Sequence, residues 1–579
     1  MKKNRIFDKN QIVVACLLFI CVLLVFIIFF ISHRTISTVG SAQVTVTRAE
    51  VEKAYAFLGQ DEAVQTALHG LQTDEMVTYG DYRKFLEQLH LWEAVDFEQF
   101  LDWEQCENQR VSADMLAESR DTVAELFETA VSASEKQAET DTADSVLSMP
   151  QVDEHTKIRV LLLHAGEPVA KEVRFSANEA YTISWNGKTK EKKKNQVIRA
   201  GQLKLSVGQT AVIQSAKGEV YLADEDGRRA TLGYSGSIHI TRYADGYAVV
   251  NEVAIEDYLY GVVQSEMPAY FATEALKAQA VCARTYIVAQ LMQDNYPQYD
   301  ADVDDSVQFQ AYNKAAPDAR VVEAVDATRG QILSKDGLPI HAYFFSTSYG
   351  MTSGREIWGL SSLDYLQPVR GNQDADTQDL SDEKRFRAYI KEQNPDDYDA
   401  SSSYYRWKAQ LDLSSHLEDV KTFLKGIDEA QTEHVIIRDS SGRETTKAAM
   451  ETWKEALQLK VLERSSSGAV KRLLVVFSGG EAEVLNESCI RQLLGIWMTG
   501  LRDKDGSSLS VGDMLPSAYF YVQPVKDGIV LFGGGLGHGI GMSQYGADGM
   551  AGRGADMREI LDFYYKDVSL EQLYGEDLT

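Results

Sequence analysis

The run Ser265-Glu266-Met267-Pro268 stands directly before a long predicted helix, residues 272–291. Apolar residues recur in that segment at three- and four-residue steps, which is the periodicity of an amphipathic helix. Thr273 is the predicted N-cap, with Glu274 beside the positive helix end. The proline bounds a turn, so we expect Glu266 to present its carboxylate from that turn.

Glu266 is the candidate acid/base because its neighbours in the sequence are apolar or aromatic. A carboxyl group in such surroundings can keep its proton near neutral pH, as a general acid must. The alternative is that Glu266 is an ordinary surface charge. The neighbours are Tyr258, Tyr260, Met267, Pro268, Tyr270 and Phe271.

A second unusual run, residues 533–549, contains eight glycines in seventeen positions. This density indicates unusual backbone geometry or the close approach of a ligand. No Gly-Lys-Ser/Thr follows, so the run is not a phosphate loop. It carries hydrogen-bonding side chains of the kind that sugar binding uses, and the alternative is a structural turn with a satisfied histidine. These side chains are His538, Ser543, Gln544 and Tyr545.

Two hydroxyl residues, Ser346 and Ser348, follow a predicted buried strand, residues 340–345. They suit the rim of a site or a tight turn. A serine hydrolase pairing either serine with His538 is conceivable, although no nucleophile-elbow pattern supports it. The ten histidines are dispersed, without H-x-x-x-H or C-x-x-C spacing. We therefore expect no metal and no cofactor.

The charge balance of the 579-residue chain, 58 − 86 = −28, argues against a nucleic-acid partner. The five cysteines form no disulfide framework. Residues 12–31 are twenty apolar residues without a charge, and a helix of that length spans ~30 Å, enough to cross a bilayer. Basic residues precede this run, so the N-terminus is predicted to be cytoplasmic and the rest of the chain extracytoplasmic. A signal peptide cleaved near residues 39–42 is the alternative, but the apolar run is longer than the apolar region of a usual signal peptide.

The fold class expected is α+β, in three parts. Residues 1–34 are a cytoplasmic tail and transmembrane anchor, and residues 35–150 are a helical extension with an acidic linker. Residues 151–579 are a mixed α/β region with a β-rich first part, in which residues 371–460 form a divergent elaboration. The first part is predicted from short β-like runs at 158–163, 180–184, 203–207 and 238–241.

Three ordered motifs resemble the stage II sporulation protein D (SpoIID/LytB) family. They are Leu259-Tyr-Gly-Val-Val-Gln-Ser-Glu-Met-Pro268, Glu274-Ala-Leu-Lys-Ala-Gln-Ala-Val-Cys-Ala-Arg-Thr-Tyr286 and Gly537-His-Gly-Ile-Gly-Met-Ser-Gln-Tyr-Gly-Ala547. Residues 343–348 and 356–358 also fit the family in order. The resemblance covers about residues 157–574 and leaves the helical extension outside it.

The resemblance implies a peptidoglycan lytic transglycosylase acting on glycan strands that a partner amidase has stripped of stem peptides. It places the catalytic glutamate at Glu266. That residue would protonate the glycosidic oxygen between N-acetylmuramic acid and N-acetylglucosamine, then accept the muramyl O6 proton as a 1,6-anhydro end forms. A hydrolase usually needs two carboxylates, whereas this reaction needs one. The candidate sugar contacts are Gln279, Arg284, Ser346, Ser348, Glu356, His538, Ser543, Gln544 and Tyr545.

The chain also departs from the family. Some relatives carry a Cys/His zinc loop where residues 302–312 here contain neither residue type, which argues against zinc. Phe345 stands where the family often has a histidine. The expected partners are glycan strands, a cell-wall amidase and other membrane-anchored wall-remodelling proteins. The alternatives are a non-catalytic amidase enhancer or wall-binding protein, and a structural component of a membrane complex built on residues 49–137.

Overall fold

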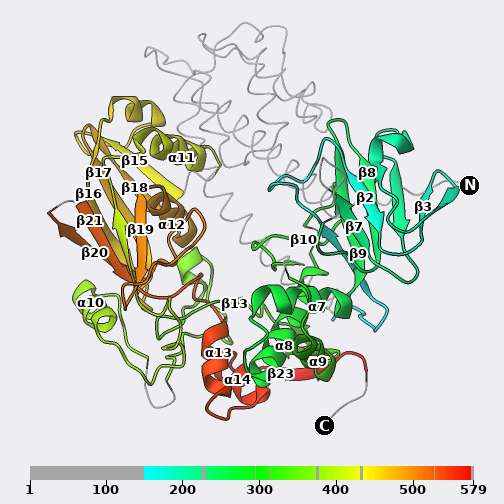
Figure 1. Ribbon diagram of the computed structural model, residues 1–579. Coiled ribbons are helices and arrows are strands. Elements are labelled where there is room, and N and C mark those ends of the chain that lie inside the picture. The colour runs from blue at the N-terminus through cyan, green and yellow to red at the C-terminus, as the bar shows by residue number, and fades with distance from the viewer. Residues whose placement is uncertain are drawn as a thin grey trace, which may run out of the picture. The chain divides into compact units, whose positions relative to one another are not determined.

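The computed structural model describes residues 149–575, apart from 224–229, 294, 313–314, 373–376, 431–433 and 527 (Figure 1). These residues lie in the second of two compact units, Ser148–Thr579. The predicted anchor at 12–31 and the helical extension fall outside the described residues. Within the described part, no helix is both long and apolar enough to cross a bilayer.

The first part of this unit is rich in β-structure, as the sequence predicts, and the unit as a whole is α+β. Its main sheet has seven strands in the order β10-β1-β9-β8-β6-β3-β4. Alternating apolar residues of β1, such as Ile158 and Val160, enter the core. The strands are β1 Lys157–Leu161, β3 Tyr181–Trp185, β4 Lys188–Lys192, β6 Thr210–Gln214, β8 Ser237–Arg242, β9 Tyr247–Ala254 and β10 Val303–Asp304.

A smaller sheet joins β5 Ile198–Arg199, β2 Arg174–Ala177 and β7 Val220–Ala223. The strand predicted at 203–207 is wrong. The chain there leaves a short 3₁₀ helix, Ala200–Leu203, through Lys204 in the left-handed conformation at φ 51°. That backbone conformation turns the chain and is incompatible with an extended strand.

A helical layer follows the first sheet and is built around α8, Thr273–Gln290. The predicted N-cap, Thr273, is wrong by one residue. The N-cap in the structure is Ala272, which makes no side-chain cap hydrogen bond. The predicted amphipathic face is also incomplete, because almost every residue from Ala275 to Ala289 is buried. Several elements pack around α8 (Figure 1), among them α7 Ile255–Glu266, α9 Ala319–Ala327, α13 Gln544–Ala551, α14 Met557–Tyr564 and β11 Gln331–Lys335. Small alanine side chains permit this close packing.

Two short parallel strands bring distant motifs together. Phe344–Phe345 (β13) pairs with Met542–Ser543 (β22), with Phe345 opposite Ser543. The chain on either side adds single bridges, from Thr347 to Leu536 and from Ser353 to Ile540. The glycine run therefore lies alongside residues 343–353. Nearby, β11 pairs with β12 Leu338–Pro339 and β23 Ser569–Gln572, and residues Arg355–Trp358 form a 3₁₀ turn.

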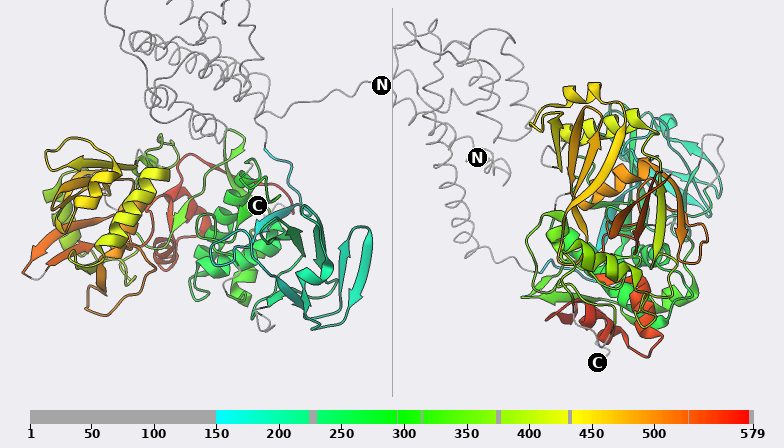
Figure 2. Two further views of the ribbon diagram at one scale, coloured as in Figure 1. Left: turned by 90° about the horizontal axis from the view of Figure 1, so that it is seen from above. Right: turned by 90° about the vertical axis from the view of Figure 1, so that its left-hand side faces the viewer.

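Most of the chain between Trp407 and Leu531 forms a body with a second hydrophobic core. One of its sheets contains β15 Val435–Asp439, β18 Gly480–Leu485, β17 Val470–Phe477 and β16 Ala456–Arg464. The other contains β19 Met498–Asp503, β14 Trp407–Leu411, β21 Gly528–Gly533 and β20 Phe520–Val525. Helices α11 Leu417–Ala430 and α12 Glu487–Ile496 pack on the first sheet (Figure 2), and the body also holds a 3₁₀ segment Lys447–Thr452. Helix α10 Glu383–Lys391 contacts β20, but its buried residues belong to the first core. Since β14 pairs with β19 and β21, this body extends well beyond residue 460.

Candidate active site

Glu266 is the last residue of α7, so its carboxylate leaves the end of a helix and not an isolated turn. The side chain is half-buried. Its Oε1 accepts a hydrogen bond from the backbone N–H of Ala311 at 2.7 Å, and its Oε2 accepts one from Nε2 of Gln544 at 3.3 Å. A helix C-terminus carries partial negative charge, which disfavours an ionised carboxylate at that position.

Burial raises the pKa of Glu266 above its ordinary value. The two hydrogen bonds from Ala311 and Gln544 act in the opposite direction, because they stabilise the charged form, but burial is the larger effect. Among the described residues, no second carboxylate contributes to this shift. The site thus presents one carboxyl group whose protonated form is favoured by burial, with two donors placed to stabilise the ionised form.

The donor at Ala311 is positioned by the two residues beside it. Gln310 accepts a hydrogen bond from the hydroxyl of Tyr258 at 3.2 Å and donates to the carbonyl of Ala283 at 3.2 Å. Tyr312 donates to Oδ1 of Asn251 at 2.8 Å. These contacts attach the loop to β9, α7 and α8. Sequence reasoning missed Ala311 because the donor is a backbone group.

This loop includes the segment aligned with the zinc loop of some relatives. The carboxylate of Asp304 accepts hydrogen bonds from the hydroxyl of Tyr296 and the backbone N–H of Ser306, each at 2.7 Å. In the part of the chain that the structure describes, no group of three or more His, Cys, Asp or Glu side chains is arranged to hold a metal. The loop is held by hydrogen bonds between protein groups.

Of the predicted contact residues, Gln544 reaches Glu266, and Gln279 reaches Gln544. Gln544 is the first residue of α13, and its Nε2 also lies 3.5 Å from Oε1 of Gln279. Gln279 is fully buried on α8. The resemblance pointed to both glutamines, but only the packing of α13 on α8 shows that their amides are neighbours.

His538 lies inside the structure as a neutral ring. Its Nδ1 accepts a hydrogen bond from the N–H of Ile540 at 3.0 Å, and its Nε2 lies 3.0 Å from the carbonyl of Phe344. Nε2 must therefore carry the hydrogen. Burial lowers the pKa of His538 to about 4, and the ring of Trp358 packs 5.1 Å away. Both nitrogens are occupied by backbone groups, so His538 is not paired with Ser346 or Ser348.

The serines of the two motifs form part of the scaffold. The N–H of Ser348 donates to the hydroxyl oxygen of Ser543 at 3.1 Å, and the hydroxyl of Ser348 donates to the carbonyl of Met351 at 3.0 Å. Both serines are buried. Ser346 is half-buried, and its hydroxyl lies 3.3 Å from that of Thr347. Ser346 is therefore the more accessible candidate.

Close backbone approach explains part of the glycine run. A Cβ on Gly541, where φ is +78°, would lie 2.0 Å from the carbonyl oxygen of Tyr343. No other residue fits at such a distance without displacing a strand. The glycines here thus serve the pairing of residues 343–353 with residues 536–543.

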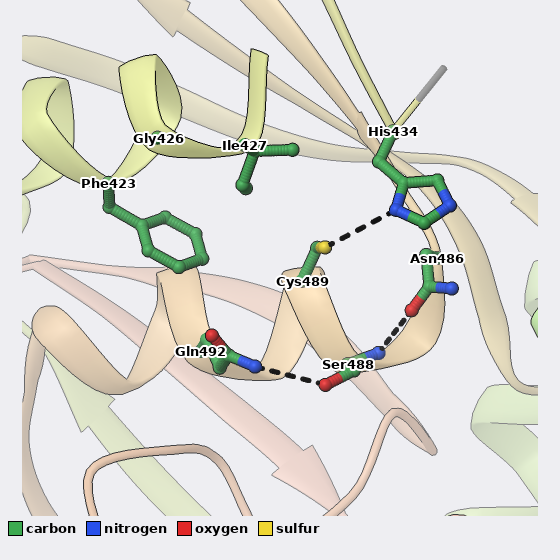
Figure 3. A pocket seen from close by; sticks show the side chains of 8 residues that line it. All are labelled: Phe423, Gly426, Ile427, His434, Asn486, Ser488, Cys489 and Gln492. Carbon is green, nitrogen blue, oxygen red and sulfur yellow. Dashed lines mark hydrogen bonds between the residues drawn. The ribbon is translucent and has the colours of Figure 1, made fainter. Parts of the chain in front are cut away.

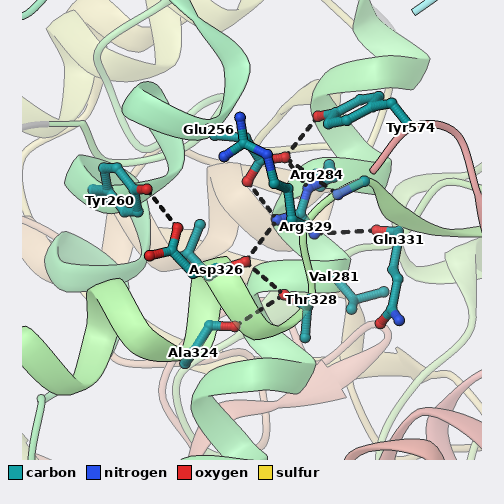
Figure 4. Close-up of polar contacts among 12 residues, drawn as sticks. Glu256, Tyr260, Val281, Arg284, Ala324, Asp326, Thr328, Arg329, Gln331 and Tyr574 are labelled. Atoms are coloured by element: carbon teal, nitrogen blue, oxygen red, sulfur yellow. Dashed lines mark hydrogen bonds and ion pairs between the residues drawn. The ribbon is translucent and has the colours of Figure 1, made fainter. Parts of the chain in front are cut away.

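Arg284 is committed to a buried ion pair and does not meet Glu266 (Figure 4). Its Nε and a terminal nitrogen each donate to the carboxylate of Glu256 at 2.8 Å. Tyr574 donates to the same carboxylate at 2.6 Å. Arg284 thereby ties α8 to α7, and Glu256 in turn holds Tyr574 near the end of the chain.

The remaining candidates, Tyr545 and Glu356, are half-buried. The ring of Tyr545 packs edge-on against Phe271 at 5.0 Å, next to the turn that follows Glu266. Glu356 lies in the 3₁₀ turn Arg355–Trp358, and its Oε1 has no hydrogen-bond partner. Both residues stay predicted sugar contacts.

A cavity of about 510 Å³ lies in the second body, between α11 and α12 (Figure 3). Its polar groups include Cys489, whose sulfur lies 3.9 Å from Nδ1 of His434. Burial raises the pKa of Cys489, so the thiol is not activated as a nucleophile. None of its lining residues belongs to the Glu266 site; they are Phe423, Gly426, Ile427, His434, Asn486, Ser488, Cys489 and Gln492.

Comparison with known proteins gives two family matches. Residues 243–334 match the family described as stage II sporulation protein, and residues 352–541 match a domain of unknown function, DUF8618. The first match contains Glu266, and the second contains most of the second body.

Individual relatives agree with the first match. An uncharacterised protein of Brachyspira hyodysenteriae is 26% identical over 71% of this chain and 92% of its own length. Stage II sporulation protein D of Bacillus subtilis is 27% identical over 58% of this chain and 79% of its own. The amidase enhancer of Bacillus subtilis is 28% identical over 54% of this chain, which spans 40% of that relative. Residues 243–334 therefore form a stage II sporulation protein (SpoIID) domain, and the chain is similar to stage II sporulation protein D over a longer stretch.

Proposed function

We propose that this protein is a lytic transglycosylase that cleaves the bond between N-acetylmuramic acid and N-acetylglucosamine in peptidoglycan glycan strands and leaves 1,6-anhydro ends. The match of residues 243–334 to the SpoIID family and similarity to an amidase enhancer support a function at the cell wall. The observation that carries the proposal is Glu266, a single half-buried carboxyl with a raised pKa and two neutral hydrogen-bond donors.

The reaction proceeds in two proton transfers. Protonated Glu266 gives its proton to the glycosidic oxygen as the bond to the muramyl C1 breaks. The carboxylate that forms is stabilised by Ala311 N–H and Gln544 Nε2. It then removes the proton from the muramyl O6 hydroxyl as that oxygen bonds to C1, so Glu266 ends protonated again. No water enters the balance, which is why one carboxyl group suffices.

The surrounding residues take different parts in this proposal. Ser346, Glu356 and Tyr545 are sugar contacts, because their side chains are only half-buried. Gln544 orients the acid, and Gln279 contacts the amide of Gln544. Ser348, Ser543, His538 and Arg284 support the site through contacts within the protein.

We further propose that residues 12–31 anchor the protein as a single-pass membrane protein, with its N-terminus in the cytoplasm and the Glu266 site outside. Denuded strands would come from a cell-wall amidase, and other membrane-anchored wall-remodelling proteins would be its neighbours.

The test is incubation of the purified protein with amidase-treated peptidoglycan, read by mass spectrometry. Wild type should release 1,6-anhydromuramyl products, and Glu266→Gln should release none, because a carboxamide cannot donate this proton. Glu323→Gln is the matched control, since Glu323 is exposed on α9. Equal product from Glu266→Gln and wild type would rule the proposal out.

Similarity to the amidase enhancer supports a second candidate, a non-catalytic enhancer of a wall amidase. An enhancer would not need the proton of Glu266. In this case wild type would form no anhydro product, and wild type and Glu266→Gln would stimulate an amidase equally.

A further inference from the structure

Asp399 is a fully buried carboxyl group beside the start of α13. It belongs to a turn at residues 397–402, inside the segment that diverges from the family motifs. Its Oδ1 accepts hydrogen bonds from the backbone N–H of Ser348, at 2.7 Å, and from the hydroxyl of Ser543. One oxygen atom therefore contacts both the segment containing Ser348 and the glycine run containing Ser543.

Ser543 carries this contact into α13. It is the N-cap residue of that helix, and its hydroxyl oxygen accepts the N–H of Gly546 at 3.2 Å. The next residue, Gln544, donates to Glu266. An unbroken set of contacts thus runs from Asp399 through Ser543 to the candidate acid.

The same turn fits closely against the body of α13. A Cβ on Gly549 would lie 2.1 Å from the carbonyl oxygen of Tyr398, and one on Gly546 would lie 2.9 Å from Oδ2 of Asp399. Only glycine permits this approach, so these two glycines of the motif serve the contact between the turn and the helix.

Placing a carboxyl group here is costly, because burial disfavours its charge. Burial raises the pKa of Asp399 to about 7, even though the hydrogen bonds from Ser543 and Ser348 lower it. An apolar side chain would fill the space without that cost. What an apolar side chain cannot do is accept the two hydrogen bonds that orient residues 348 and 543.

We infer that Asp399 is a positioning residue for Glu266: it fixes Ser543 and the first turn of α13, so that the amide of Gln544 faces the carboxylate. The segment containing residues 371–460 would then contribute directly to the geometry of the Glu266 site. The kinetic part of the test rests on the proposed function, and the structural part does not.

The structural part is hydrogen–deuterium exchange of the full chain, followed by mass spectrometry. Asp399→Ala and Ser543→Ala should each raise the exchange rate of amides in residues 543–551 by about tenfold or more, because the first turn of α13 loses its anchor. The double variant should add little to the larger single effect, since the two side chains act through one contact. Asp399→Asn keeps Oδ1 as an acceptor and should stay near wild type.

Asp397→Asn is the matched control. Asp397 lies in the same turn and is buried, but it accepts hydrogen bonds from Tyr405 and Asn394 instead of α13. Exchange at 543–551 should stay unchanged in this variant. If Asp399→Ala unfolds the whole protein, the exchange measured in Ser543→Ala tests the inference instead, because that variant keeps the hydrogen bond between Asp399 and Ser348. Unchanged exchange at 543–551 in Ser543→Ala, or in a folded Asp399→Ala, overturns the inference.

The kinetic part measures kcat and KM for anhydro-product release. Asp399→Ala should lower kcat by about 10- to 100-fold, the effect of misplacing a reacting group by about an ångström, with KM much less affected. The alkaline limit of the pH profile should also move upward, because Glu266 loses a donor to its charged form. Raised exchange with unchanged kcat and pH profile would overturn the positioning role. If wild type forms no product, the proposed function is contradicted, but the structural part of the inference is not.

Discussion

The side-chain nitrogen of Gln544 lies 3.3 Å from Oε2 of Glu266 and joins residues 278 positions apart. This contact brings the last residue of α7 against the first residue of α13. A neutral donor stabilises the carboxylate formed after proton transfer without keeping the free acid fully ionised. The protonation state of Glu266 thus depends on how α13 is held.

Gln544→Ala tests this dependence. Losing the donor should raise the pKa of Glu266, so the alkaline limit of activity should move to higher pH. The rate at neutral pH should fall by roughly tenfold or more, because a hydrogen bond to a charged group is worth about 1.5–3 kcal/mol. Product release measured between pH 4 and 9 checks both effects. Gln367→Ala, at a glutamine bonded to Leu363, is the control, and identical pH profiles for the two variants would contradict the prediction.

The imidazole of His538 should remain neutral throughout pH 5–8. The pKa of His538 in the folded protein is about 4, below the ordinary 6.5. The contribution of the neutral ring to the free energy of unfolding is therefore fully present above pH ~6.5 and is lost as the pH falls toward about 4. The loss should reach about 3 kcal/mol, at 1.36 kcal/mol for each pH unit of difference. Urea unfolding at several pH values should show it, and His538→Gln should lack this part of the slope. A ring that titrates near pH 6.5 by NMR would contradict the assignment.

Arg284→Met should lower the free energy of unfolding by about 3–5 kcal/mol, because it leaves Glu256 as a buried unpaired charge. Arg284→Met combined with Glu256→Gln should cost less than the sum of the single changes. Arg558→Met is the control: its pair with Asp562 is exposed and should contribute less than ~1 kcal/mol. Urea denaturation measures all four variants. Equal losses for Arg284→Met and Arg558→Met would show that the buried pair is not structural.

Asp399 should make stability depend on pH in the opposite sense to His538. Its folded pKa of about 7 lies above the 3.8 of an ordinary aspartate. The unfolded chain releases the proton first, so stability falls as pH rises from about 4 to about 7, by up to ~4 kcal/mol. Electrostatic repulsion from Asp397 also raises the pKa of Asp399, whereas Tyr564 stays neutral because burial raises its pKa. Asp399→Asn should remove the slope in urea unfolding at pH 5 and 8; an unchanged slope would contradict the shift.

The fold could be read from the sequence where the signals are local. Alternating apolar residues predicted the strands that became β1 and β8, and helical spacing predicted α8. The strand at 203–207 failed because the left-handed turn at Lys204 leaves no mark on the pattern of apolar residues. The predicted amphipathic face of α8 was incomplete because neighbours from distant segments bury its other faces.

By itself, the sequence determined which carboxyl group to consider, the order of the motifs and the match of residues 243–334 to the SpoIID family. Those features reside in residue identities and short spacings. Only the tertiary structure decided that Ala311 and Gln544 reach Glu266, that Arg284 pairs with Glu256, and that His538 is closed off by backbone groups. The physical reason is that a side chain's role depends on which of its hydrogen bonds are already satisfied, and its partners here lie tens to hundreds of positions away.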